Sequence, residues 1–82
     1  MNEVTLCARR IGQPNVHEYF ARKFPLPDYY GNNLDAFYDV LTSLSQTTVK
    51  IRGTVKTEQG ERVLAVLRDA ATENDKLTLI EK

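Results

Sequence analysis

Residues 26–44, with the sequence LPDYYGNNLDAFYDVLTSL, join a rigid turn to a helix that is acidic on one face and apolar on the other. Pro27 and Gly31 define the turn, and Asn33 is a favourable N-cap for a helix over residues 34–44. Apolar residues at helical spacing form a stripe that is typical of a core-facing helix: Leu34, Phe37, Val40, Leu41 and Leu44. We interpret this turn and helix as the feature around which the chain is organised.

The opposite face of the predicted helix carries Asp35, Tyr38, Asp39 and Thr42. Asp35 and Asp39 are four residues apart, where like charges on a helix repel each other by roughly a few tenths of a kcal/mol. No lysine is placed to relieve this repulsion. A local conflict of this kind is typical of a functional site, and we therefore interpret the face as a recognition surface.

Negative charge is concentrated in the sequence around this helix. No lysine or arginine lies between Lys23 and Lys50, whereas three aspartates do, so the segment carries a net charge of −3. Because the chain has 11 basic and 11 acidic residues, the remainder carries +3. Tyrosines, which are enriched at protein interfaces, accompany the acids at positions 29, 30 and 38. A solvated acidic face is the common alternative, but the missing countercharge and the tyrosines favour recognition of a cationic protein pocket.

Alternating apolar and polar residues predict three strands, at residues 2–8, 47–52 and 77–80. Helical spacing predicts two more helices, over residues 14–23 and 58–73, with Thr57 as the N-cap of the second and residues 9–13 as a loop. In the resulting order β-α-α-β-α-β, helical crossovers favour parallel strands with right-handed connections. We predict an α/β fold, with residues 1–82 as a single compact domain whose three-stranded parallel sheet is packed with helices and has the first strand at its centre.

Composition excludes several classes of protein. With 82 residues, 41% of them hydrophobic and 27% charged, the chain resembles an ordinary globular domain rather than a disordered segment. Its zero formal net charge argues against direct binding of nucleic acid, which normally requires a basic surface. No segment approaches the roughly 20 apolar residues that span a bilayer, and no basic start is followed by an apolar run. We therefore expect a cytoplasmic monomer with no membrane partner.

Individual residues give little support for catalysis or metal binding. Cys7 has no histidine or cysteine partner nearby, and we interpret it as a buried core thiol. His17 is the only histidine and has no second ligand at metal-binding spacing, so we expect it at the surface or in a packing role. An enzyme that uses Asp35 and Asp39 as an acid–base pair or metal site is an alternative, but both lie on one convex helix face without a cleft. We predict no catalytic residue, metal or cofactor.

The run Leu26-Pro-Asp-Tyr-Tyr-Gly-Asn-Asn-Leu-Asp-Ala-Phe-Tyr-Asp-Val-Leu-Thr resembles the signature of the barstar family, intracellular inhibitors of barnase-type bacterial ribonucleases. The similarity is dense over residues 16–44 and weaker over residues 63–80, where Val66-Leu-Arg-Asp-Ala is similar to the last helix of the family. The resemblance implies an immunity protein of the toxin–antitoxin kind, which protects its own cell by binding a small basic ribonuclease or related toxin.

In that family, the second helix and the loop before it plug the active site of the ribonuclease, whose arginines and histidine hold an aspartate. Carried over to this sequence, the resemblance implies that Tyr29 covers the catalytic histidine and that Asp39 enters the phosphate pocket as a mimic of RNA phosphate. Asp35 would meet further basic groups. The remaining contact residues would be Gly31, Asn33, Leu34, Tyr38, Thr42, Leu44 and, at the edge, Asp69, where the family has a glutamate.

The sequence departs from the family pattern at the rim of this surface. Tyr38 and Leu44 stand where barstar carries tryptophans, the paired cysteines of the family are absent, and the connection between Gly53 and Glu61 is shorter. The carboxylate anchor is kept, so the resemblance implies a similar binding mode, whereas the altered apolar rim indicates a cognate nuclease that differs from barnase. An alternative that stays open is an immunity or regulatory module for a basic partner that is not a nuclease.

Overall fold

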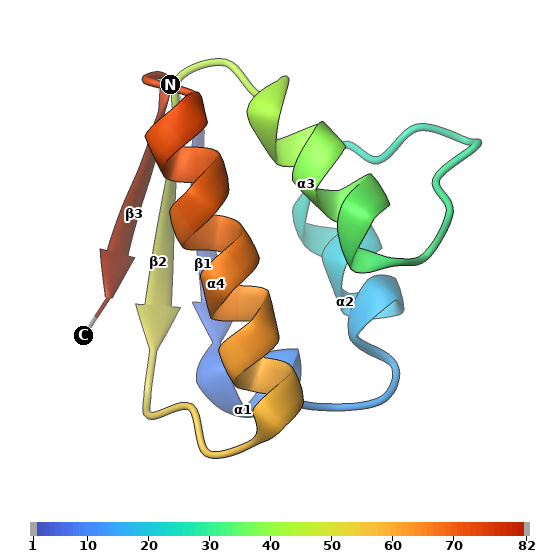
Figure 1. The fold of residues 1–82 in the computed structure, drawn as a ribbon, viewed down its shortest axis with the longest axis vertical. Coiled ribbons are helices and arrows are strands. Elements are labelled where there is room, and N and C mark those ends of the chain that lie inside the picture. The colour runs from blue at the N-terminus through green and yellow to red at the C-terminus, as the bar shows by residue number, and fades with distance from the viewer. Residues whose placement is uncertain (1, 82) are drawn as a thin grey trace.

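The structure, a computed structural model that describes residues 2–81, contains a parallel sheet and helices in the predicted order. The elements are β1 (Asn2–Cys7), α1 (Ala8–Ile11), α2 (Val16–Lys23), α3 (Leu34–Thr42), β2 (Thr47–Arg52), α4 (Glu58–Glu73) and β3 (Leu77–Glu81). The predicted α/β class and three-stranded parallel sheet are confirmed (Figure 1). The predicted loop at residues 9–13 is wrong in its first half, because Ala8 and Ile11 are buried and anchor the helical turn α1.

β2 lies at the centre of the sheet, which has the strand order β1-β2-β3. Asn2, Thr47 and Leu77 lie level with one another, so the amino ends of the strands are aligned. The prediction that the first strand is central is therefore wrong. The apolar alternation of residues 2–8 indicated which face of that strand is buried, but it carried no information about whether both backbone edges are paired.

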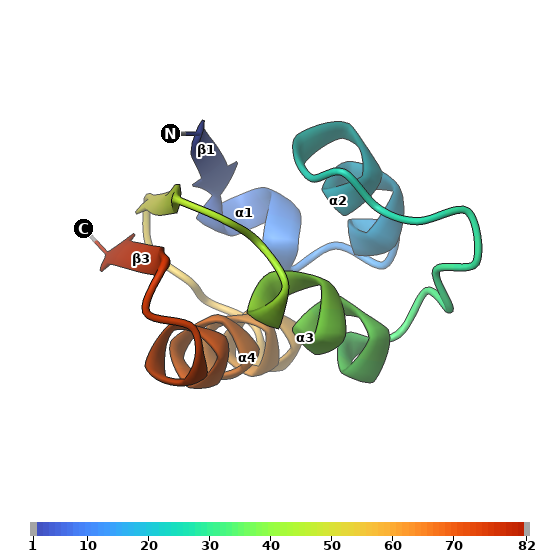
Figure 2. The same cartoon turned by 90° about the horizontal axis from the view of Figure 1, so that it is seen from above.

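The four helices of residues 2–81 lie on one side of the sheet, as the view from above shows (Figure 2). Because the chain moves one strand in the same direction at each right-handed crossover, both connections cross the same face. Burial along β2 alternates accordingly: Thr47, Val49 and Ile51 are buried, whereas the side chains between them are not. In Figures 1 and 2, α3 and α4 form a front layer, and α1 and α2 lie behind it.

Three phenylalanines connect α2 to α3. The rings of Phe20 and Phe37 are stacked, with centroids 3.8 Å apart and planes inclined by 5°. Phe24 lies edge-on to both rings. Each of the three side chains is buried, so this cluster fixes the direction in which the outer face of α3 points.

Cys7, which we expected in the core, is exposed. It follows the buried Leu6 and therefore points to the outer face of the sheet, which is covered by none of the helices that the structure describes. The burial preference of cysteine is overridden here because the sheet has only one covered face. The backbone N–H groups of Arg10 and Arg9, in the first turn of α1, lower the pKa of the thiol.

An exposed ion pair joins α4 to β3. Arg68 donates two hydrogen bonds to Glu81, with N–O distances of 3.0 and 2.7 Å. These hydrogen bonds raise the pKa of Arg68 and lower that of Glu81. The pair fixes the carboxyl end of β3, an edge strand, to the helix that covers it.

Candidate protein-binding site

α3 presents the carboxylates of Asp35 and Asp39 to solvent. Both side chains are exposed, and neither has an ion-pair partner within 4.0 Å among residues 2–81. The opposite side of the helix buries Phe37 and Leu41 completely. The predicted division of this helix into an acidic face and a core face is therefore present in the structure.

Asn33 fixes the start of α3 and the end of the loop before it. Its Oδ1 accepts a hydrogen bond from the backbone N–H of Ala36 at 2.8 Å, as the predicted N-cap requires. Its Nδ2 donates to the carbonyl oxygen of Gly31 at 3.2 Å. One side chain thus holds both the first turn of the helix and the turn that precedes it.

A groove of about 650 Å³ separates the loop at residues 25–31 from α3. Six of the residues that line it are Pro27, Tyr29, Gly31, Asp39, Val40 and Leu44. The Tyr29 side chain is 89% exposed, the largest exposed fraction of any large hydrophobic side chain among the residues described. An unpaired carboxylate, an exposed aromatic ring and an apolar floor therefore meet at one opening.

Tyr30, the neighbour of Tyr29, ties this loop to α2. Its hydroxyl oxygen lies 2.7 Å from Nδ1 of His17, and it also donates to the carbonyl of Asn33 at 3.5 Å. Burial lowers the pKa of His17 and raises that of Tyr30 to about 12. His17 is thus in the predicted packing role, and its contact holds the loop close to α3.

The C-terminal end of α3 is held by side chains from two directions. The hydroxyl groups of Thr42 and Ser43 donate to the carbonyl of Asp39 at 3.0 and 3.1 Å. From α4, the buried Asn74 donates through Nδ2 to the carbonyls of Leu41 at 3.0 Å and Leu44 at 2.8 Å. These contacts satisfy carbonyl groups that a helix end leaves without partners.

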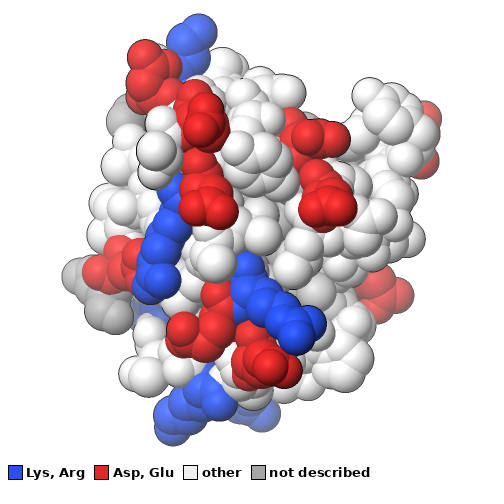
Figure 3. Space-filling view, viewed as in Figure 1, with Lys and Arg blue, Asp and Glu red and all other residues white. Residues whose placement is uncertain are grey.

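Two acidic residues on α4 extend the negative surface of α3. Asp69 and Glu73 are exposed and lie four residues apart, on the same side of α4. Asn74 holds this end of α4 against α3, which places the two pairs of acids on one face of the molecule. Red side chains on both helices are visible on this face in Figure 3. We call Asp35, Asp39, Asp69 and Glu73 the acidic surface.

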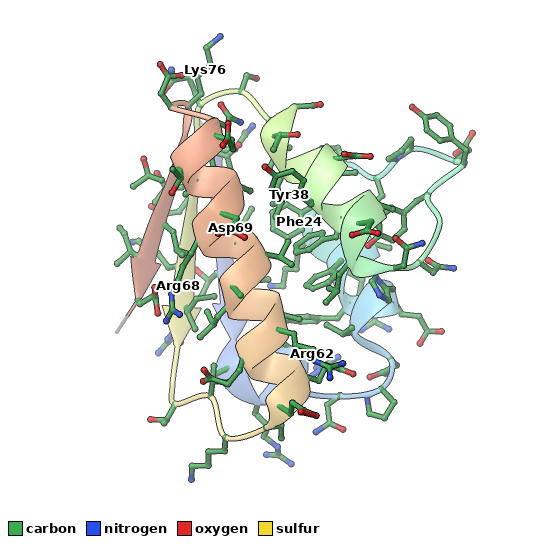
Figure 4. All side chains as sticks on the ribbon, in the orientation of Figure 1. Phe24, Tyr38, Arg62, Arg68, Asp69 and Lys76 are labelled. Carbon is green, nitrogen blue, oxygen red and sulfur yellow. The ribbon has the colours of Figure 1, made fainter. Side chains whose placement is uncertain are left out.

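The structure brings most of the predicted site residues together on α3 and its loop. Gly31, Asn33 and Asp35 are exposed, as is Asp69 on the neighbouring helix. The others are half-buried and form the floor or sides of the surface: Leu34, Tyr38, Thr42 and Leu44. Tyr38, which we expected on the outer face of α3, packs against the core where α3 meets α4 (Figure 4).

Several residues of this region were missed in the sequence. Tyr30, Ala36, Val40 and Ser43 line the groove, and Glu73 belongs to the acidic surface. A signal existed for Glu73, because it follows the predicted residue Asp69 by four positions and such pairs share a helix face. The contribution of Tyr30 depends on a loop conformation that residue spacing does not encode.

Within residues 2–81, no group of three or more histidine, cysteine, aspartate or glutamate side chains is placed to hold a metal ion. None of the helices described there is long and apolar enough to cross a membrane. What the region offers chemically is a fixed array of carboxylates and aromatic rings, which suits contact with a cationic surface.

Comparison with protein families identifies a match over nearly the whole chain. The family model described as Barstar (barnase inhibitor) matches residues 2–80, which is essentially the whole chain.

Proposed function

The chain belongs to the barstar family of barnase inhibitors, and we propose that it binds a small basic ribonuclease and blocks its active site with α3 and the loop before it. The observation that carries this proposal is the pair of exposed carboxylates, Asp35 and Asp39, which have no ion-pair partner among the described residues. An acidic residue without a countercharge in its own chain is available to a cationic group of another.

Asp39 is the candidate for the mimic of RNA phosphate. It lines the groove from the middle of α3, where a bound partner would exclude water from it. A ribonuclease must hold phosphate with cationic groups, and a guanidinium group can make two parallel hydrogen bonds to a carboxylate as it does to a phosphate. The same pocket of the enzyme can therefore accept Asp39 in place of its substrate.

The contacts that hold α3 support tight binding because they reduce the cost of ordering the site. Asn33 fixes the N-terminal end of the helix, and Asn74 fixes its C-terminal end. Phe37 is buried in the aromatic cluster beneath it. A surface that already has its binding conformation loses little conformational entropy when the partner arrives.

Tyr29 and the acids of α4 have separate roles in this proposal. Tyr29, exposed at the mouth of the groove, supplies a large apolar ring that binding would bury. Asp69 and Glu73 lie to one side of the groove, on α4, where exposed charges attract a basic partner before contact is made. The proposed interface thus has an aromatic and anionic centre with an acidic rim.

The test is an RNA-cleavage assay in which a barnase-type ribonuclease is titrated with the purified protein. We expect cleavage to stop near equimolar ratio, and to continue at that ratio with Asp39→Ala. Glu3→Gln is the matched control, because it also removes one negative charge but lies on the outer face of the sheet. Unchanged cleavage at a large molar excess of the parent protein, over a panel of small basic ribonucleases, would refute the proposal.

A further inference from the structure

A second charged surface lies at the carboxyl ends of β1 and β2. It consists of four exposed basic residues, Arg9, Arg10, Arg52 and Lys56, which we call the basic surface. Arg52 ends β2 at the level of Cys7, after which α1 begins and carries the two other arginines. The connection that follows Gly53 returns against α1, since a Cβ on Gly53 would lie 3.6 Å from that of Ala8 and Thr57 contacts Gly12. The fold therefore gathers four cations from three segments.

The cations of the basic surface have no acidic partner of their own. None of the four forms an ion pair within 4.0 Å in the part of the chain that the structure describes. The nearest acid along the chain, Glu58, is paired with Arg62 at 3.5 Å. Lys23 of α2 extends the positive region, because Lys23 and Arg10 both lie over the ring of Tyr19, at 5.6 and 4.7 Å from its centroid.

The basic and acidic surfaces lie on different segments of the molecule. The acidic surface is on α3 and α4, whereas the basic surface is on α1, the end of β2 and the connection that follows it (Figure 1). The formal net charge of the whole chain is zero. Two copies therefore experience no overall repulsion, and a net charge near zero favours association. What remains between them is attraction between surfaces of opposite sign.

We propose that the basic surface of one copy binds the acidic surface of a second copy. The contact is heterologous, because it joins two different surfaces, and it adds molecules head to tail rather than closing a symmetric pair. It also covers Asp35 and Asp39, so self-association competes with any other partner of the acidic surface. The inference depends on the charge distribution of this chain and does not require that the partner be a ribonuclease.

A second copy fits the basic surface better than a nucleic acid does. Proteins that bind single-stranded nucleic acid combine cations with exposed aromatic rings on which bases stack. The aromatic ring beside the basic surface, that of Tyr19, is only 7% exposed and already contacts Arg10 and Lys23. By contrast, four unpaired acids of matching number are present on every copy of the chain.

Sedimentation equilibrium of the full chain tests this inference. At low ionic strength, we expect the average mass to rise with protein concentration. In about 0.5 M salt we expect it to fall to the monomer mass, because the Debye length is then only a few ångströms and charge attraction is largely screened. Arg52→Glu is expected to raise the dissociation constant about tenfold or more, since it places like charges opposite each other. Lys76→Glu is the matched control: it makes the same charge change at an exposed position between α4 and β3 (Figure 4) and should associate as the parent does.

A mixing experiment tests the head-to-tail geometry. Arg52→Glu keeps an intact acidic surface, and a variant with Asp35→Lys and Asp39→Lys keeps an intact basic surface. Each is expected to be monomeric alone, and an equimolar mixture to form dimers that do not grow further. A parent protein that stays monomeric at millimolar concentration and low salt would overturn the proposal. So would a mixture that stays monomeric, or a basic surface that binds single-stranded RNA without self-association. Inhibition of a ribonuclease is measured in dilute protein, where self-association is absent. The proposed ribonuclease inhibition and the proposed self-association can therefore be refuted independently.

Discussion

Asp35 and Asp39 differ in their surroundings, and this difference predicts different kinetic effects. Asp39 lines the groove, whereas Asp35 lies in the first turn of α3, outside the groove lining. We expect Asp39→Ala to weaken binding mainly through faster dissociation, because the complex loses the charge pair between Asp39 and a cationic group of the ribonuclease, which binding buries. We expect Asp35→Ala to slow association at low salt and to have little effect at high salt. Stopped-flow measurements with the ribonuclease at two salt concentrations separate the two effects. A parent-like dissociation rate for Asp39→Ala would contradict the proposed binding mode.

His17 makes the stability of the protein depend on pH. Burial lowers the pKa of its imidazole, so the folded state binds a proton less readily than the unfolded chain does. The contribution of neutral His17 is therefore fully present above the ordinary histidine pKa of about 6.5, and is lost as pH falls through the lower folded-state value. Urea unfolding at several pH values, compared with His17→Gln, measures this contribution. The difference in unfolding free energy between the two proteins should shrink as pH falls from about 8 to about 5.

A constant difference between the parent and His17→Gln over that range would show that His17 does not titrate in the window. The stability that His17 is expected to lose at low pH has a structural cause. Nδ1 of neutral His17 can either accept the single hydrogen of the Tyr30 hydroxyl or donate to its oxygen, whereas the imidazolium can only donate. Protonation thus charges a partly buried ring and changes the contact that holds the loop before α3.

At the residue scale, the helix caps were predictable, whereas the exposure of Cys7 was not. Asn33 and Thr57 were identified as N-caps because their side chains can accept a hydrogen bond from the first turn, and both do so. Cys7 was assigned to the core on a general preference of cysteine, and it is exposed because one face of the sheet is open. A cap depends on its immediate neighbours, whereas burial depends on the placement of every layer.

At the element scale, Asn74 joins the ends of α3 and α4. Its amide donates to two carbonyls of the α3 terminus, and its Oδ1 accepts from the backbone N–H of Lys76 at 3.0 Å. Asn74→Ala removes these hydrogen bonds from a buried position, so we expect about 1–3 kcal/mol less unfolding free energy. Thermal or urea unfolding measures the loss. Thr72→Ala, at an exposed position on the same helix, is the control and should cost much less.

Asn74→Asp tests whether the destabilisation expected for Asn74→Ala comes from the missing hydrogen bonds or from the smaller side chain. Aspartate has nearly the same shape but cannot donate to the carbonyls of Leu41 and Leu44. We expect it to destabilise the protein at least as much as alanine does at neutral pH, because a carboxylate would face two carbonyl oxygens. A stable Asn74→Asp variant would show that the amide does not hold the two helices together.

The helices themselves could be predicted from spacing, but the groove between loop and helix could not. The stripe that contains Phe37 and Leu41 defined the buried side of α3, and both residues are fully buried. The groove depends on the path of residues 25–31, which includes a contact between Tyr30 and His17, 13 positions apart in sequence. No periodicity links two such residues, so this part of the site became visible only in the folded chain.

At the scale of the whole molecule, the class of fold was predictable and the order of strands was not. Helices between strands require parallel pairing, and this prediction is confirmed. Which strand is central depends on the direction of each crossover along the sheet, and residues 2–8 and 47–52 both alternate well enough to be central. Both crossovers move by one strand in the same direction, which places the helices described here on one face of the sheet and leaves the other face uncovered by them.

The open face leads to a prediction that compares two residues of β3. Leu77 points into the core and is 4% exposed, whereas Ile80 points to the outer face and is 37% exposed. We expect Leu77→Thr to lower the unfolding free energy by about 2–4 kcal/mol, because it removes buried apolar volume and buries a hydroxyl. Ile80→Thr should change it by only about 0.5 kcal/mol, since threonine also favours a strand and the site is partly solvated. Urea unfolding of both variants in dilute protein makes the comparison. Equal losses would mean that something covers the outer face in solution, because only a covered surface makes Ile80 as costly to replace as Leu77.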